Sequence, residues 1–155
     1  CSVFFMLKER SYGAILFRQV GDHRLYLLLD RDGKQWNFSK GHGEDGETEL
    51  STMKRELAEE TGISDLLVAQ NFHEKITYFF RQAGELVVKE VVFFLCKTAQ
   101  EDVHLSKEHV GYRWVSYDDA LHVLSFDNAK DVLRKAEALL ASGKAVFQRQ
   151  LTELA

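Results

Sequence analysis

The stretch from residue 41 to residue 63 constrains the fold more than any other part of the chain, because a glycine-rich loop runs directly into a helix-forming segment. Thr48 follows the loop and has a side chain that can cap a helix start. Gly62 can end the same helix in the left-handed conformation. We therefore predict a helix over residues 48–61, which must pack one face against the rest of the molecule.

The two faces of this predicted helix differ in character, since each residue advances the helix by about 100°. One face is an apolar stripe of Leu50, Met53 and Leu57. Beside it lies an acidic row of Glu49, Glu56 and Glu60, with Glu59 next to that row. Carboxylates three and four positions apart repel one another, and each pair costs an isolated helix roughly 0.2–0.5 kcal/mol. A positive group must compensate.

A divalent cation is the compensating group that the residue types favour. We expect Arg55 to point away from the row of Glu56 and Glu60 and to reach only Glu47 or Glu59. Oxygen ligands suit Mg²⁺, with Mn²⁺ as an alternative, whereas zinc is disfavoured because no His/Cys cluster accompanies the glutamates. Taken alone, such a run also fits an exposed acidic helix face.

Short apolar runs on both sides of this helix predict a sheet. The expected strands are residues 12–17, 25–30, 66–72, 76–80, 86–97 and 112–115. Turns are expected at residues 21–22 and 82–85, and further helices at residues 116–124 and 127–141. The last dozen residues fit either one more helix or a frayed tail. These elements allow an α/β fold, with helices packed on the faces of a mixed sheet.

Length and charge limit the organisation and the partners of the chain. At 155 residues, 45% of them apolar types, the chain suits one domain over residues 1–155. The formal net charge of −4 provides no broad basic surface, so we do not expect duplex DNA as a partner.

The cysteines and the opening residues bear on the location of the protein. Cys1 and Cys96 belong to no ligand spacing, which indicates a reducing, cytoplasmic setting. The apolar residues 1–7 are much shorter than a membrane span and lack the basic start and the cleavage site of a signal peptide. We therefore expect neither export nor membrane anchoring.

The spacing of the fixed residues resembles the signature of the Nudix hydrolase family. Gly41 is followed after five residues by Glu47, and after seven more by Arg-Glu-Leu-Ala-Glu-Glu-Thr-Gly-Ile, residues 55–63. A chance match over so many positions is improbable. The resemblance extends over nearly the whole chain, and it implies the Nudix fold, a mixed β-sheet sandwiched between α-helices.

The resemblance also implies roles for the residues of this signature, residues 41–63, which is called the Nudix box. Glu56 and Glu60 are expected to be the main metal ligands, Glu59 a further or water-mediated ligand, and the backbone carbonyl of Lys40 part of the same shell. The catalytic residues are expected among Glu56, Glu59 and Glu60, and Glu56 and Glu59 both remain candidates for the general base. The positions with structural roles are Gly41, Glu47, Arg55 and Gly62, of which Glu47 and Arg55 hold the loop against the helix.

Two flanking segments, residues 36–42 and 105–114, look like those of the asymmetric diadenosine tetraphosphate hydrolases. By that resemblance Lys40 and His42 lie along the phosphates, and Glu108 is a metal-binding carboxylate from a distant loop. Tyr78 and Tyr112 resemble the aromatic pair that sandwiches an adenine, and Lys89 a phosphate-facing lysine. All of these except Lys40 have a plain alternative: packing for the tyrosines, a loop position for His42, a solvated charge for Glu108 and an exposed position at a sheet edge for Lys89.

The sequence departs from the family pattern in one respect. The family commonly has proline where Ser39 stands, and often another near Asp45, whereas this chain has no proline. We expect a more mobile loop here.

The expected reaction is Mg²⁺-dependent hydrolysis of a pyrophosphate bond, converting diadenosine tetraphosphate to ATP and AMP. The alternatives are removal of pyrophosphate from the 5′ end of RNA, hydrolysis of another nucleoside polyphosphate, and a non-catalytic nucleotide-sensing module.

Overall fold

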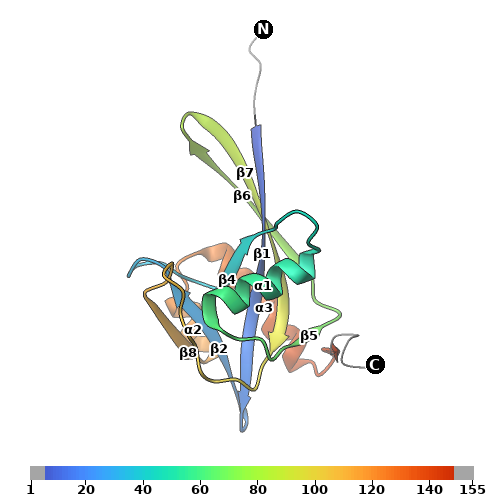
Figure 1. The fold of residues 1–155 in the computed structure, drawn as a ribbon. Coiled ribbons are helices and arrows are strands. Elements are labelled where there is room, and N and C mark those ends of the chain that lie inside the picture. The colour runs from blue at the N-terminus through green and yellow to red at the C-terminus, as the bar shows by residue number, and fades with distance from the viewer. Residues whose placement is uncertain (1–5, 149–155) are drawn as a thin grey trace.

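The computed structural model describes residues 6–148, and within them a large sheet carries helices on both faces (Figure 1). The strands are β1 (Met6–Val20), β2 (His23–Asp30), β3 (Trp36–Asn37), β4 (Ser39–His42), β5 (Leu67–Ala69), β6 (Glu74–Gln82), β7 (Glu85–Lys97), β8 (Gly111–Val115) and β9 (Phe147–Gln148). The helices are α1 (Glu49–Thr61), α2 (Tyr117–Val123) and α3 (Asp127–Ala141).

The sheet is mixed, as predicted. Its main path runs β3-β2-β1-β7-β5-β9, while β4 pairs with β1, β6 with β7 and β8 with β2. The long strands β1 and β7 run parallel, from the pair Met6 and Leu86 to the pair Phe17 and Lys97, and the other pairings are antiparallel. The predicted turns at residues 21–22 and 82–85 join β1 to β2 and β6 to β7.

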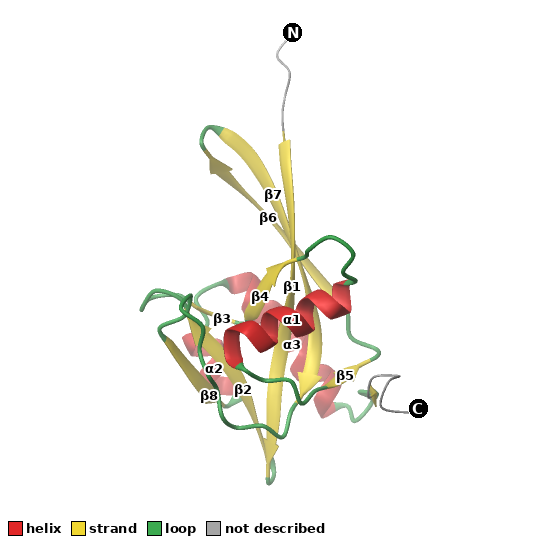
Figure 2. Cartoon of the chain, in the orientation of Figure 1, coloured by secondary structure: helices red, strands yellow, loops and turns green. Residues whose placement is uncertain are grey.

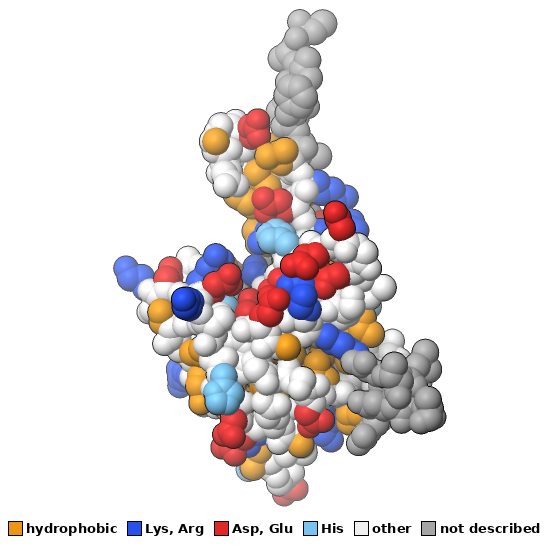
Figure 3. Space-filling view, viewed as in Figure 1, with side chains coloured by type: hydrophobic (Ala, Val, Ile, Leu, Met, Phe, Trp, Pro, Cys, Tyr) orange, Lys and Arg blue, Asp and Glu red, His pale blue; other side chains and the backbone are white. Residues whose placement is uncertain are grey.

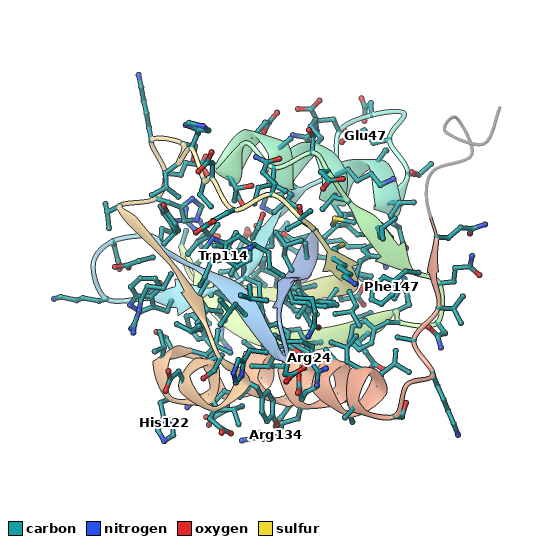
Figure 4. The ribbon with its side chains drawn as sticks, turned by 90° about the horizontal axis from the view of Figure 1, so that it is seen from below. Arg24, Glu47, Trp114, His122, Arg134 and Phe147 are labelled. Carbon is teal, nitrogen blue, oxygen red and sulfur yellow. The ribbon has the colours of Figure 1, made fainter. Side chains whose placement is uncertain are left out.

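The central strands bury residues on both faces, which creates three layers. In β1, Ile15 and Phe17 face α2 and α3, whereas Ala14 and Leu16 face α1. Figure 4 shows α1 on one side of the sheet and the C-terminal helices on the other. Leu57 is fully buried against the sheet and Met53 is 1% exposed, so the predicted apolar stripe docks α1. The predicted sandwich of a mixed sheet between helices is confirmed.

Local chemistry fixes both ends of α1 where the sequence predicted them. The Thr48 hydroxyl accepts a hydrogen bond from the backbone N–H of Ser51, and the Ser51 hydroxyl accepts one from the backbone N–H of Thr48. Gly62 closes the helix with φ of 74° and donates to the carbonyl of Ala58. These bonds satisfy backbone groups that a bare helix end would leave without partners.

The hairpin of β6 and β7, together with the start of β1, projects beyond the helices as an arm (Figure 2). Side chains alternate between its two faces, so the paired residues Tyr78 and Lys89 lie on one face and Glu90 lies on the other. Arg10 of β1 donates to Glu90, with Nη2 to Oε2 at 2.8 Å. This contact ties the edge of the arm together.

Several predicted boundaries were wrong. Residues 39–42 form strand β4, paired with β1, so Ser39 lies in a strand and not in the loop expected there. The strand expected over residues 66–72 covers only Leu67–Ala69.

Of the last dozen residues, 144–148 contain strand β9 and no helix, and residues 149–155 lie outside the described part. Among the residues that the structure describes, no helix is long and apolar enough to cross a membrane.

Candidate active site

Glu60 is the buried centre of the site. It stands in the last turn of α1, only 4% exposed, and its Oε2 accepts a hydrogen bond from the hydroxyl of Ser39 on β4. Burial raises the pKa of Glu60 to about 7, as do the charges of Glu56 and Glu108, while the bonds from Ser39 and the Lys40 backbone lower it. Because burial removes solvation from an ionised carboxylate, Glu60 needs a positive charge nearby to stay ionised.

Gly41 allows strand β4 to approach the helix at Glu56. A Cβ built on Gly41 would lie 2.0 Å from the side-chain Cδ of Glu56, so any larger residue would displace this carboxylate. Burial raises the pKa of Glu56, and the neighbouring charge of Arg55 opposes that rise. The box glycine therefore makes room for a box glutamate.

Arg55 forms hydrogen bonds to the other carboxylates of the site. Figure 3 shows acidic side chains gathered over α1 around a small basic area. The Nε of Arg55 donates to Glu47 at 2.7 Å, and its Nη2 donates to the carbonyl of His42 at 2.8 Å, so it does hold the loop against the helix. Its Nη1 donates to Glu59 at 3.1 Å. The prediction that it would avoid Glu56 was wrong, because Nη1 also lies 3.0 Å from Glu56 Oε1.

The hydrogen bonds from Arg55 also lower the pKa of the loop residue Glu47. They hold the pKa of Glu47 at about 2, well below its usual range. Glu47 therefore stays ionised at any physiological pH, and its Oε1 also accepts a hydrogen bond from the backbone N–H of Glu44 at 2.7 Å.

A cavity of about 230 Å³ opens beside Glu60. Twelve residues from strands, helix and loops line it: Leu29, Arg31, Gln35, Asn37, Phe38, Lys40, Glu60, Tyr78, Lys89, Glu108, His109 and Phe126. Five of the predicted site residues therefore meet in one pocket, namely Lys40, Glu60, Tyr78, Lys89 and Glu108. Carboxylates, cations and aromatic rings share its wall.

The cationic side of the pocket consists of Lys40, Lys89 and Arg31. Burial lowers the pKa of Lys40 to about 8, and the charges of Lys89 and Arg31 lower it further. Burial also lowers the pKa of Lys89. Cations that repel one another in a concave site are well suited to a polyanion, because its charge relieves their repulsion.

The aromatic side chains that line the pocket include Tyr78, Phe126 and the buried Phe38. The Nζ of Lys40 lies 3.5 Å from the Tyr78 hydroxyl and 5.8 Å from the ring centroid. Phe126 precedes α3 and is 39% exposed although it is a large apolar residue. An exposed ring at the mouth of a polar pocket is available for stacking.

Two of the predicted substrate-binding residues do not line this pocket, and neither do Glu56 and Glu59, which were predicted as metal ligands. Tyr112 lies on the edge strand β8, paired with Leu29, and is 41% exposed. The ring of His42 is exposed, with Nδ1 3.3 Å from the carbonyl of Arg10. Their predicted roles in adenine and phosphate binding stay predictions.

Seven lining residues were missed by the sequence reasoning: Leu29, Arg31, Gln35, Asn37, Phe38, His109 and Phe126. Asn37 lies within the segment of residues 36–42 that was singled out, and Gln35 lies directly before that segment, so their place in the chain was an available signal. His109 stands beside Glu108, and its buried Nδ1 has no hydrogen-bond partner among the described residues. For Phe126 the only signal was an apolar residue between two predicted helices.

The residues present fit a hard divalent cation. Within residues 6–148 no three His, Cys, Asp or Glu side chains stand together closely enough to hold a metal ion as arranged here, where Arg55 bonds to Glu56 and Glu59. The donor set is nevertheless carboxylate and carbonyl oxygen, which Mg²⁺ and Mn²⁺ prefer. Glu60 in particular is a buried acid that a cation would stabilise.

Comparison with known proteins agrees with this geometry. The family model described as the NUDIX domain matches residues 7–136. The rat asymmetrical bis(5′-nucleosyl)-tetraphosphatase is 35% identical, covering 88% of this chain and 98% of its own length. The enzyme of that name from Caenorhabditis elegans is 31% identical, covering 85% and 96%.

A crystal structure of a C. elegans Ap4A hydrolase binary complex superimposes with a TM-score of 0.77 at 29% identity, covering 86% of this chain and 98% of that one. The fold, the box and these relatives define the class, and the chain belongs to the Nudix hydrolase family. It is a Nudix pyrophosphohydrolase, similar over most of its length to asymmetrical Ap4A hydrolases.

Proposed function

We propose that this chain forms one Nudix domain that hydrolyses diadenosine tetraphosphate asymmetrically to ATP and AMP, using Mg²⁺. The observation that carries the proposal is a pocket that Glu60 and Glu108 line together with lysines and aromatic rings. The relatives with that activity in their names, 31–35% identical over most of their length, support the choice of substrate.

The pocket walls suit the parts of such a substrate. Lys40, Lys89 and Arg31 bind phosphate oxygens through positive charge. Tyr78 and Phe126 stack on an adenine, a contact worth roughly 1–3 kcal/mol per base. Because Tyr112 lies outside the pocket, Phe126 is the better second ring for this adenine.

The carboxylates supply the cation site. Members of this family generally use divalent metal ions, typically Mg²⁺. Here Glu56, Glu59, Glu60 and Glu108, with the carbonyl of Lys40, are the groups to hold the ion, and Mn²⁺ is the alternative. When bound, it polarises water and neutralises charge on the phosphate oxygens. Glu56 or Glu59 accepts the proton of the attacking water.

A substrate panel tests the proposal. The protein with Mg²⁺ is offered diadenosine tetraphosphate, nucleoside triphosphates, and capped and triphosphorylated RNA, and the products are identified by chromatography. We expect ATP and AMP in equal amounts from diadenosine tetraphosphate, at the highest kcat/KM of the panel. Faster release of pyrophosphate from RNA would favour the RNA alternative, and tight binding without release would favour a sensing module.

A carboxylate variant tests the site itself. Glu60→Gln keeps the shape of the side chain but removes its charge, so we expect turnover to fall by about 10²- to 10⁴-fold. Glu101→Gln is the matched control, since the Glu101 side chain is 75% exposed and contacts Arg18. Near-normal turnover of Glu60→Gln would contradict the assigned role.

The cytoplasm stays our expectation for the location, which cell fractionation tests. The thiol of Cys96 is free and buried.

A further inference from the structure

Ser39 forms a direct hydrogen bond to Glu60, the buried acid of the site. Its side chain is 4% exposed, and its hydroxyl reaches Oε2 of Glu60. An ionised carboxylate can only accept hydrogen bonds, so the hydroxyl must be the donor. The proposed function gives Glu60 a role but leaves this contact unexplained.

The position of the Ser39 hydroxyl is fixed by the sheet. Strand β4 pairs with β1, where Ser39 lies opposite Ala14, and Ala14 packs on the side of the sheet that faces α1. Glu60 is held on α1, whose stripe of Met53 and Leu57 is buried against the same face. Donor and acceptor therefore stand on two separate elements that packing holds together.

The hydrogen bonds to Glu60 come from neutral groups on β4. One is the Ser39 hydroxyl, and the other is the backbone N–H of Lys40. Arg55 instead bonds to Glu47, Glu56 and Glu59. Two neutral donors can orient a carboxylate without cancelling its charge, and they leave lone pairs free for a cation.

We infer that Ser39 is a positioning residue that presents the Glu60 carboxylate to a divalent cation. The inference rests on the proposed function, because it assumes that Glu60 binds such an ion. Proline, common at this place in the enzymes that the chain resembles, has no side-chain donor. The serine is thus a feature of this chain's own site.

Direct ion binding tests the inference without any substrate. The protein is freed of metal with EDTA and then titrated with Mn²⁺ alone, and free Mn²⁺ is measured by electron paramagnetic resonance. Groups that orient a ligand typically change metal affinity by about 10- to 100-fold when removed. We therefore expect Ser39→Ala to bind Mn²⁺ at least about tenfold more weakly than the wild type.

Two further variants separate hydrogen bonding from packing. Ser39→Cys keeps nearly the same shape with a weaker donor, so its Mn²⁺ affinity should fall between those of wild type and Ser39→Ala. Ser11→Ala removes a hydroxyl from a serine that is 1% exposed on the neighbouring strand β1, and it should bind Mn²⁺ like the wild type. Thermal unfolding checks that all variants are folded.

The outcomes distinguish this inference from the proposed function. Wild-type affinity in Ser39→Ala, with Mn²⁺ binding intact in the wild type, would overturn the role of Ser39 and leave the proposed function standing. Wild-type affinity in Ser39→Cys, beside a loss in Ser39→Ala, would show that the shape of the side chain and not its hydrogen bond matters. No Mn²⁺ binding by the wild type would overturn the ion site and the inference together.

Discussion

At the scale of single residues, Gly41 shows how the absence of a side chain leaves room for the Glu56 carboxylate. Gly41→Ala would bring a methyl group within 2.0 Å of Glu56 Cδ. Because the end of a glutamate side chain can move, we expect little loss of stability, but turnover should fall by about 100-fold as the carboxylate shifts. Steady-state kinetics and thermal unfolding measure the two effects.

The control for Gly41→Ala is Gly43→Ala, two residues further along. A Cβ on Gly43 would meet the Thr52 hydroxyl at 3.3 Å and would leave Glu56 untouched. We expect nearly normal turnover from it. If both variants were equally active, the close approach at Gly41 would not matter for the reaction.

The buried carboxyl group of Glu60 should lower the stability of the metal-free protein when it is ionised. Its pKa is raised to about 7 in the fold, against about 4.3 in an unfolded chain. The protonated form favours folding, so this contribution to stability is full below about pH 4 and is lost as the pH rises through 7. We expect metal-free Glu60→Gln to be more stable than the wild type by about 2–3 kcal/mol at pH 8.

Denaturant unfolding in EDTA at several pH values checks this prediction. The gap between Glu60→Gln and wild type should close toward pH 4, where the wild-type carboxyl is protonated in both states. A gap that did not depend on pH would show that burial of charge at Glu60 is not its cause.

The residues also show what sequence reasoning can reach. Spacing along one helix placed Glu56, Glu59 and Glu60 together, since helical geometry converts sequence distance into direction. The contact of Arg55 with Glu56 was missed because a long flexible side chain can turn back past its own helix position. The hydroxyl of Ser39 was missed because its partner lies 21 positions away on another element.

At the scale of elements, α1 depends on its end as much as on its faces. Gly62 has a φ of 74°, and a Cβ there would lie 3.3 Å from His104. We expect Gly62→Ala to lower the free energy of unfolding by about 1–2 kcal/mol and to leave kcat nearly unchanged. Urea unfolding measures the loss.

Gly143→Ala is the matched control at the end of α3. Gly143 has a φ of 72° with nothing near its Cβ position, so the variant should show the backbone strain without the contact. A large loss of kcat in Gly62→Ala below its unfolding temperature would contradict a purely structural role for this box residue.

Element prediction succeeded where the chain carries local signals and failed where pairing decides. The caps at Thr48 and Gly62 fixed α1, and the turn at residues 82–85 fixed the hairpin of β6 and β7. Strand β4 is Ser-Lys-Gly-His, with no alternation and a glycine, so only its pairing with β1 makes it a strand. Tertiary contacts, which no local pattern contains, explain the difference.

At the scale of the whole molecule, the pocket is assembled from distant parts of the chain. Tyr78 and Lys89 come from the arm, Glu60 from α1, Glu108 from a loop and Phe126 from the start of α3. Only the fold brings these five together, which is why Phe126 could not be predicted as a lining residue of the pocket.

The layer opposite the site is held by a cluster that should affect stability and spare chemistry. Tyr26 is fully buried, and its hydroxyl donates to Glu137 of α3, to which Arg24 Nη2 also donates at 2.6 Å. Figure 4 shows Arg24 between sheet and helix, with Arg134 on the outer side. Glu137→Ala leaves a buried hydroxyl without its partner, so we expect a loss of about 1–3 kcal/mol in the free energy of unfolding.

The matched control is Asp131→Ala, which removes an exposed ion pair with Arg134 on the same helix and should cost less than about 1 kcal/mol. Because α3 and the carboxylates of α1 lie on opposite faces of the sheet, turnover of Glu137→Ala should stay normal well below its unfolding temperature. Chemical unfolding and kinetics at a low temperature measure both quantities. A fall in kcat of the folded variant would mean that the two faces are coupled through β2, whose residues alternate between both cores.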